Sequence, residues 1–183
     1  MQRFVYLFIF TYLLFPLQAT GQQEGQSFCD GIATASYFPL TIKKKNVLWA
    51  ETAYFEKQVG EFSFNGKRYV GYTQEWKSGS IDTLYLRSEN DKVYQYQSCC
   101  SQEDLRYDAR AAIGDSWQSA DGQATYTVVS KSASLETPFC SYTNLLQLRA
   151  QLKAQRFDFF YLKGYGYIGA TFDGQLISAA SPK

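Results

Sequence analysis

The chain has 183 residues, a length that suits one domain with a hydrophobic core. Its 18 Lys and Arg residues against 17 Asp and Glu give a formal net charge of +1, which argues against the basic surface of a nucleic-acid binder. No histidine occurs, which excludes Ser-His-Asp and Cys-His catalysis, His-ligated metals and imidazole acid–base chemistry.

The amino-terminal residues predict a secretory signal peptide over 1–21. Arg3 precedes an apolar run from Phe4 to Phe15, and small residues precede a cut after Gly21. The run is shorter than the about 20 residues that a membrane span needs. We therefore expect a secreted or periplasmic protein, with one β-rich domain over 22–183 and no membrane span once the signal is removed.

Charge and lipid-anchor signals are weak in the rest of the chain. Lys43-Lys44-Lys45 is the only basic run, and a run of three lysines is typical of a solvated loop. The first cysteine, Cys29, follows Gln-Ser-Phe, which does not fit a lipid-attachment site. A free protein without nucleic-acid partners is expected.

Strands are expected from Val47 onward. Val47–Phe55 is a candidate first strand, and Asn65-Gly66 between two alternating runs predicts a tight type I′ hairpin. After the hairpin, Val70, Tyr72 and Trp76 fall on one face of a strand.

Short polar turns separate the strands that follow. Further strands are expected at Ile81–Arg87 (with Leu84 and Leu86 on one side), Lys92–Gln97, Asp104–Asp108 and Ala124–Ser130. Strands at this spacing, with little between them, indicate an antiparallel meander.

One segment fits two interpretations. Asn144–Gln155 places leucines on one helical face, yet it also alternates as a strand. We favour the strand because Arg156–Leu162 can return as its hairpin partner. The fold class expected is all-β, a strongly curved antiparallel meander that forms a barrel or half-barrel.

Four cysteines, Cys29, Cys99, Cys100 and Cys140, indicate disulfides in an exported chain. Adjacent cysteines in extended backbone point to opposite sides, so Cys99 and Cys100 are expected to pair separately with Cys29 and Cys140. A Cys99–Cys100 ring and free thiols are the alternatives. A zinc site is not expected, because the chain has neither C-x-x-C nor histidine.

Gly164-Tyr-Gly166-Tyr-Ile-Gly169 matches the G-x-G-x-x-G spacing of dinucleotide-binding loops. That fingerprint needs a following helix and an acidic residue about 20 positions later, but the chain ends at Lys183. We interpret Gly164, Gly166 and Gly169 as structural glycines of a bent strand, and we expect no cofactor.

Four short motifs, in order, resemble a family of small exported or lipid-anchored β-rich proteins of Bacteroidota-type bacteria. They are Tyr37-Phe-Pro-Leu40 with Trp49, Tyr85–Tyr94, Ile113-Gly-Asp-Ser-Trp117 and Tyr161–Gly169. The chain departs from the family pattern at Lys43–Asn46, where a glycine is usual, and in lacking the lipid-attachment cysteine. The resemblance brings no activity with it, so it implies no catalytic residue.

Three functions fit the sequence. An aromatic-rich barrel can enclose an apolar small molecule, as a binding or carrier module does. A structural or interaction domain that contacts an envelope protein needs no pocket. A hydrolase without histidine needs two carboxylates, for which the candidates are Glu103, Asp104, Asp108 and Asp115.

Overall fold

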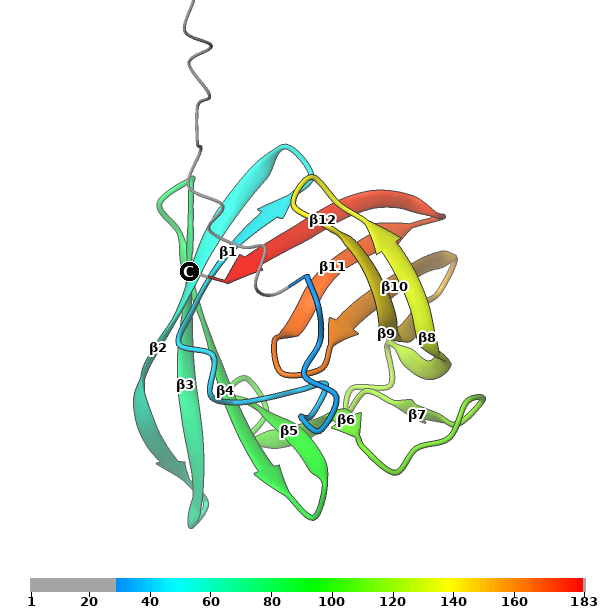
Figure 1. Cartoon of the computed structure of the whole chain (residues 1–183). Helices are drawn as coiled ribbons and strands as arrows, with labels where there is room; N and C mark the ends of the chain where they lie inside the picture. Colours follow the sequence, from blue (N-terminus) through cyan, green and yellow to red (C-terminus); the bar gives the residue numbers. More distant parts are fainter. Residues whose placement is uncertain (1–28, 183) are drawn as a thin grey trace, which may run out of the picture.

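The computed structural model describes residues 29–182 and consists of strands, turns and loops (Figure 1). The predicted signal peptide, 1–21, lies outside the described residues. The strands are β1 (Lys44–Trp49), β2 (Thr52–Phe64), β3 (Lys67–Trp76), β4 (Ile81–Glu89), β5 (Lys92–Gln97), β6 (Gln102–Asp108), β7 (Ser116–Gln118), β8 (Thr125–Glu136), β9 (Ser141–Leu152), β10 (Gln155–Leu162), β11 (Gly166–Phe172) and β12 (Gln175–Pro182).

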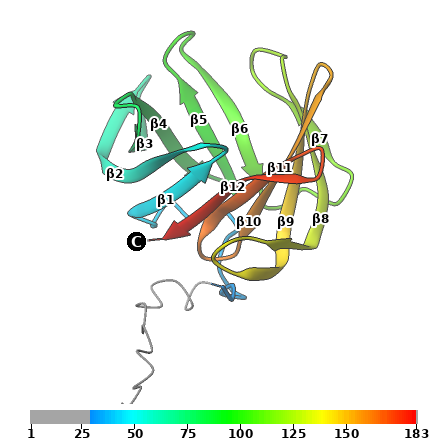
Figure 2. The ribbon, with the colours of Figure 1, turned by 90° about the horizontal axis from the view of Figure 1, so that it is seen from above.

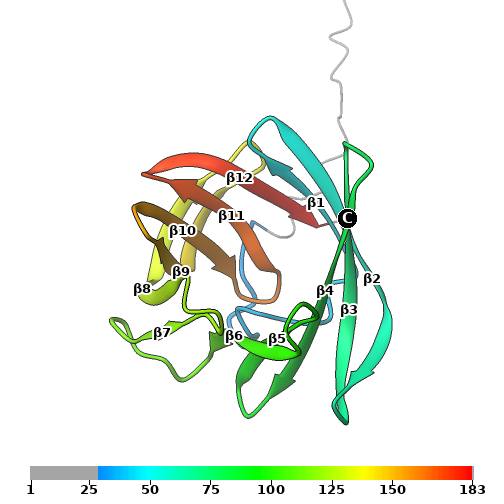
Figure 3. The ribbon, with the colours of Figure 1, turned by 180° about the vertical axis from the view of Figure 1, so that it is seen from behind.

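All twelve strands belong to one antiparallel sheet, and each strand pairs with the next in sequence except at one place. Strand β12 returns to pair with β1, as Val47 opposite Ala180 shows. The sheet therefore curves round into a nearly closed barrel with β6 and β7 as its two edges (Figures 2 and 3). The predicted all-β meander and barrel are confirmed.

The seam between β6 and β7 is bridged by side chains instead of a strand ladder. Trp117 Nε1 on β7 donates a hydrogen bond of 2.9 Å to the Leu105 carbonyl on β6. The Ala120 backbone N–H, just after β7, donates to the Asp104 carboxylate. These bonds satisfy polar groups at the two strand edges, which would otherwise be open to pairing with another chain.

The hairpin predicted at Asn65-Gly66 is confirmed. Phe64 pairs with Lys67, and Asn65 and Gly66 have φ of 52° and 75°, the two positive values that a type I′ turn requires. The strand Lys92–Gln97 has the predicted bounds, and β9 and β10 form the predicted hairpin.

The single strand expected over Val47–Phe55 is wrong. The chain turns at Ala50, whose φ is 48°, so this stretch contains the end of β1 and the start of β2. Trp49 and Thr52 face each other across that turn. The stretch therefore contributes to two strands, β1 and β2, where one was expected, and both form part of the barrel.

The segment before β1 runs between the two halves of the sheet, as the blue ribbon in Figures 1 and 3 shows. Tyr37 is buried with Val93 and Tyr107 from one half of the sheet and with Leu146 and Leu148 from the other. Its hydroxyl donates to the Lys131 carbonyl at 3.1 Å. The segment thus fills part of the barrel and forms one wall of the space that is left inside it.

The expected pairing of Cys99 and Cys100 with Cys29 and Cys140 is wrong. Cys29 is bonded to Cys140, while Cys99 and Cys100 are exposed free thiols with their sulfurs 2.7 Å apart. The expectation assumed extended backbone at Cys99 and Cys100, but both lie in the turn between β5 and β6. In that turn the two thiols come to the same side.

Candidate functional site

The barrel contains a cavity of about 350 Å³ between β1–β6, the β10–β11 hairpin and the segment before β1. Eight aromatic side chains line it: Phe38, Trp49, Tyr54, Tyr72, Trp76, Phe159, Tyr161 and Tyr167. Five side chains bring polar or charged groups to it: Lys45, Glu56, Gln74, Gln95 and Arg106. A mostly apolar hollow with a few polar groups is the usual composition of a small-molecule site.

Strand alternation explains which residues face the cavity. Alternate side chains of a strand point to one side of the sheet, so Tyr72 and Trp76 of β3 both point inward. Leu84 and Leu86 of β4 reach the same cavity. The predicted shared faces of these strands are therefore the inner faces of the barrel.

Lys45 is a buried cation in the cavity wall. Its residue exposure is 8%, and it points inward together with Val47 and Trp49 of the same strand. Burial lowers the pKa of the Lys45 ammonium, and the negative charge of Glu56 partly opposes that shift. The expectation that Lys43–Lys45 is a solvated loop is wrong for Lys45, because β1 begins at Lys44.

Glu56 lies directly opposite Lys45 in the pairing of β1 with β2. Its carboxylate accepts a hydrogen bond of 2.9 Å from Gln74 Nε2 on β3. Within residues 29–182, no carboxylate oxygen comes within 4.0 Å of Lys45 Nζ, the limit for a salt bridge. The opposite charges therefore share the cavity without a direct ion pair.

Arg106 reaches the cavity from β6, at a β-bulge. Val93 pairs with Tyr107 and Tyr94 pairs with Leu105, so Arg106 is the extra residue between these two pairs. A bulge re-aims the side chains around it, and here the inserted residue lines the cavity. Its guanidinium interacts with Tyr161, where it lowers a phenol pKa that burial raises.

Burial keeps the cavity tyrosines neutral. Burial, aided by the charge of Glu56, raises the pKa of Tyr72 to about 12. Burial also raises the pKa of Tyr54 and Tyr167 well above the ordinary value. The Tyr72 hydroxyl donates to the Leu40 carbonyl at 2.7 Å, which holds the segment before β1 against β3.

The three glycines of the G-x-G-x-x-G stretch do not open a helix, because β11 and β12 follow them. Gly164 and Gly166 have φ of 84° and 79°, values that glycine adopts most readily. A β carbon on Gly169 would stand 2.5 Å from the Ser178 carbonyl oxygen. Gly166 also lines the cavity, and a β carbon added to it would stand 3.1 Å from Lys45 Nζ.

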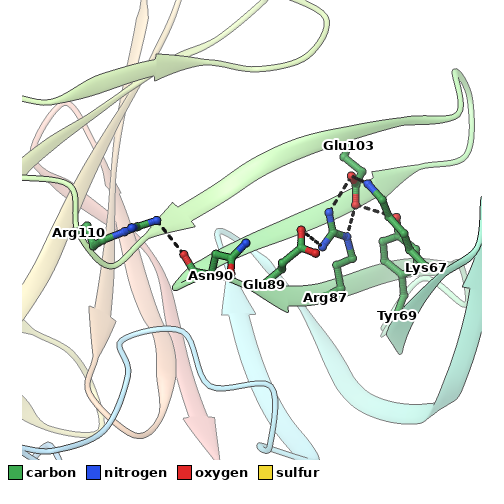
Figure 4. A network of polar contacts seen from close by, with 7 residues as sticks. All are labelled: Lys67, Tyr69, Arg87, Glu89, Asn90, Glu103 and Arg110. Carbon is green, nitrogen blue, oxygen red and sulfur yellow. Dashed lines mark hydrogen bonds and ion pairs between the residues drawn. The ribbon is translucent and has the colours of Figure 1, made fainter.

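Glu103 belongs to an ion-pair network on the other face of the sheet (Figure 4). Its carboxylate accepts hydrogen bonds from Arg87, from Lys67 Nζ at 2.6 Å and from the Tyr69 hydroxyl at 2.7 Å. Because Leu86 lines the cavity, its neighbour Arg87 points outward. The Arg87 guanidinium, with help from Lys67 and Tyr69, lowers the pKa of Glu103 to about 2 despite its partial burial.

The other candidate carboxylates also have local partners. Asp104 accepts from Gln97 at 2.8 Å, and Asp115 accepts from the Ala112 backbone N–H at 2.8 Å. Burial raises the pKa of Asp108, but its bonds to the Arg110 backbone N–H and to Lys92 outweigh that effect and lower it. These roles are those of turns and ion pairs, and none of the four carboxylates lines the cavity.

Neither metal clusters nor spanning helices are found among residues 29–182. No three Cys, Asp or Glu side chains gather there as a metal ion would require. No helix in that range is long and apolar enough to cross a bilayer.

No protein-family model matches the chain, and no curated protein matches its sequence. Two solved structures match most of this chain's length. A candidate exported protein with a YmcC-like fold from Bacteroides fragilis NCTC 9343 has a TM-score of 0.45 and 10% identity, over 80% of this chain and 97% of that one. A candidate lipoprotein from Parabacteroides distasonis ATCC 8503 has the same TM-score and identity, over 80% of this chain and 96% of that one. This similarity assigns no activity to this chain.

Proposed function

We propose that this protein is an exported binding or carrier module that holds an apolar small molecule inside its barrel. The observation that carries the proposal is the aromatic-lined cavity of about 350 Å³. Cavities of roughly 300–1,000 Å³ are the size that small-molecule sites usually have. A well-packed protein interior leaves few voids larger than a water molecule, so an opening of this size in the barrel needs an explanation.

The position of the charged groups supports binding over catalysis. The candidate carboxylate with the most strongly shifted pKa, Glu103, is held ionised by Arg87 on the outer face of the sheet. A general acid needs a pKa near the working pH, which a pKa of about 2 does not provide. A structural domain, the other alternative, does not require a cavity of this kind.

Titration with Nile red, a neutral apolar dye, tests the proposal. Dye that enters the cavity leaves water, so we expect its fluorescence to rise to saturation with one dye bound per chain. The variant Leu84→Trp adds bulk to the cavity wall and is expected to weaken dye binding by about tenfold.

The matched control is Ile81→Trp, at an exposed position of the same strand. We expect this variant to bind the dye like the parent protein. Equal dye binding by Leu84→Trp and the parent, or no saturable binding by the parent, would contradict the proposal.

A further inference from the structure

We propose that the molecule held in the barrel is an apolar anion, with its negative head group placed at Lys45 and Arg106 and its apolar body among the aromatic side chains. This inference rests on the proposed binding function and specifies the ligand class. It follows from the way charge is distributed around the cavity wall.

Two cations and one anion reach the cavity. Lys45 enters from β1, Arg106 from β6 and Glu56 from β2. Gln74 supplies a hydrogen bond to Glu56, whereas neither Lys45 nor Arg106 has a carboxylate within salt-bridge distance among residues 29–182. The lining therefore has an excess positive charge that a bound anion would balance.

Such an arrangement is costly unless a partner binds there. Lysine is rarely buried without a paired charge, because removal from water disfavours the charged form. Lys45 is buried, and Arg106 is half-buried. Here the backbone maintains the arrangement: Gly166 leaves room for the Lys45 ammonium, and Arg106 lies on the inner face of β6, two residues from Asp104, which is opposite the cavity residue Gln95. An anion bound by both would gain charge-assisted hydrogen bonds, which are stronger in a partly buried site than in water.

The surrounding walls define the rest of the ligand. Trp49 and Trp76 line the cavity from β1 and β3, and Phe38 and Leu40 line it from the segment before β1. These side chains provide apolar surface and no further cation. The structure therefore favours a molecule with one anionic end and an apolar body over a sugar or a nucleotide.

Isothermal titration calorimetry of the exported protein with decanoate, decanol and decylamine tests this inference, because the three probes share a chain and differ in their head groups. At neutral pH we expect decanoate to bind at least about tenfold more tightly than decanol, and decylamine to bind most weakly. Lys45→Met is expected to weaken decanoate by about tenfold and to leave decanol unchanged. Lys57→Met, which removes a cation from the outer face of β2, is the matched control and should change neither affinity.

The possible outcomes distinguish failure of the anionic head group from failure of the proposed binding function. Binding of decanol or decylamine as tightly as decanoate would overturn the anionic head group while retaining the cavity as a binding site. Absence of binding by all three probes and by Nile red would overturn the proposed function itself. If Lys45→Met does not fold, Arg106→Met and the three probes with the parent protein still test the anionic head group. A preference of Arg106→Met for decanoate over decanol as large as that of the parent would count against placing the head group at Arg106.

Discussion

Lys45 and Gly166 meet in the wall of the cavity: Lys45 Nζ lies 3.1 Å from the position that a β carbon on Gly166 would take. The two residues are far apart in sequence and belong to β1 and β11, on either side of β12 in the sheet. Without a side chain at position 166, the Lys45 ammonium can remain in the cavity. A glycine that first suggested a dinucleotide loop thus helps to position a buried cation.

Gly166→Ala is expected to affect both stability and binding. Its φ of 79° is strained for alanine, and the new methyl group would push Lys45 Nζ aside. We expect a loss of about 1–2 kcal/mol in unfolding free energy, measured in urea, and weaker decanoate binding by calorimetry. Gly174→Ala is the control, because Gly174 has φ of 83° but nothing within 4 Å of the added carbon. It should lose similar stability and keep full affinity; equal loss of affinity in both variants would refute the role given to Gly166.

The Glu103 network predicts a pH-dependent contribution to stability. Because the folded-state pKa of Glu103 is lowered to about 2 from 4.5, its stabilisation is complete above the unfolded pKa and is lost as pH falls toward 2. We expect Glu103→Gln to lower the unfolding free energy by about 1–3 kcal/mol at neutral pH, with the gap to the parent closing between about pH 5 and about pH 2.

Glu89→Gln provides the comparison for Glu103→Gln, since Glu89 contacts the same Arg87 but its side chain is 56% exposed. Its effect should stay below about 0.5 kcal/mol, as for other exposed pairs. Urea unfolding across that pH range measures both variants. A difference in unfolding free energy between Glu103→Gln and the parent that stays constant down to pH 2 would be inconsistent with the lowered pKa of Glu103.

The cysteines are expected to divide into one stabilising pair and one neutral pair. The Cys29–Cys140 bond closes a separation of 111 residues, so the double variant Cys29→Ser/Cys140→Ser should lose about 2–4 kcal/mol. Cys99→Ser/Cys100→Ser alters an exposed turn and should change stability by less than about 0.5 kcal/mol. Urea unfolding without reductant measures both, and the reverse ranking would contradict the connectivity.

Decanoate affinity is expected to decrease as the pH rises. The decrease should occur at pH values below 10.5, the ordinary pKa of lysine. Burial lowers the pKa of Lys45, so its ammonium loses its proton, and its attraction for a carboxylate, at a pH where free lysine remains charged. The other charged or titratable groups at the cavity are Glu56, Arg106, Tyr54, Tyr72, Tyr161 and Tyr167. Burial raises the pKa values of the tyrosines, so they do not produce the decrease.

Calorimetry of the parent and of Lys45→Met over this pH range measures that effect. The variant should bind decanoate weakly and with little pH dependence. The same decrease in affinity in parent and variant would assign the titration to another group.

Local sequence signals predicted the parts of the fold that depend on local chemistry. Asn65-Gly66 supplied both residues with positive φ for its turn, and alternation along β3 and β4 identified their inner faces. The turn at Ala50 was missed because Ala50-Glu51 contains no glycine, proline or asparagine that would indicate it. The pairing of β1 with β2 and the hydrogen bond from the Ala50 N–H to the Ile177 carbonyl on β12 accompany that conformation.

The cavity could not be predicted from local patterns. Its lining joins β1–β6 to β10–β11, and these strands meet only because β12 pairs with β1. Arg106 shares a face of β6 with Asp104, which lies opposite the cavity residue Gln95, but nothing in the sequence marks that face of β6 as the inner one. Lys45 did carry a signal, since it alternates with Val47 and Trp49, but the adjacent lysines favoured a loop interpretation.

The most direct test of the binding account is a crystal structure of the protein soaked with decanoate that carries bromine at its chain end. Anomalous diffraction locates the bromine, and the difference map locates the carboxylate. We predict a bromine peak inside the barrel among the aromatic side chains, with the carboxylate within hydrogen-bond distance of Lys45 Nζ and the Arg106 guanidinium. A bromine peak only on the outer surface of the sheet, with an unchanged cavity, would contradict the account.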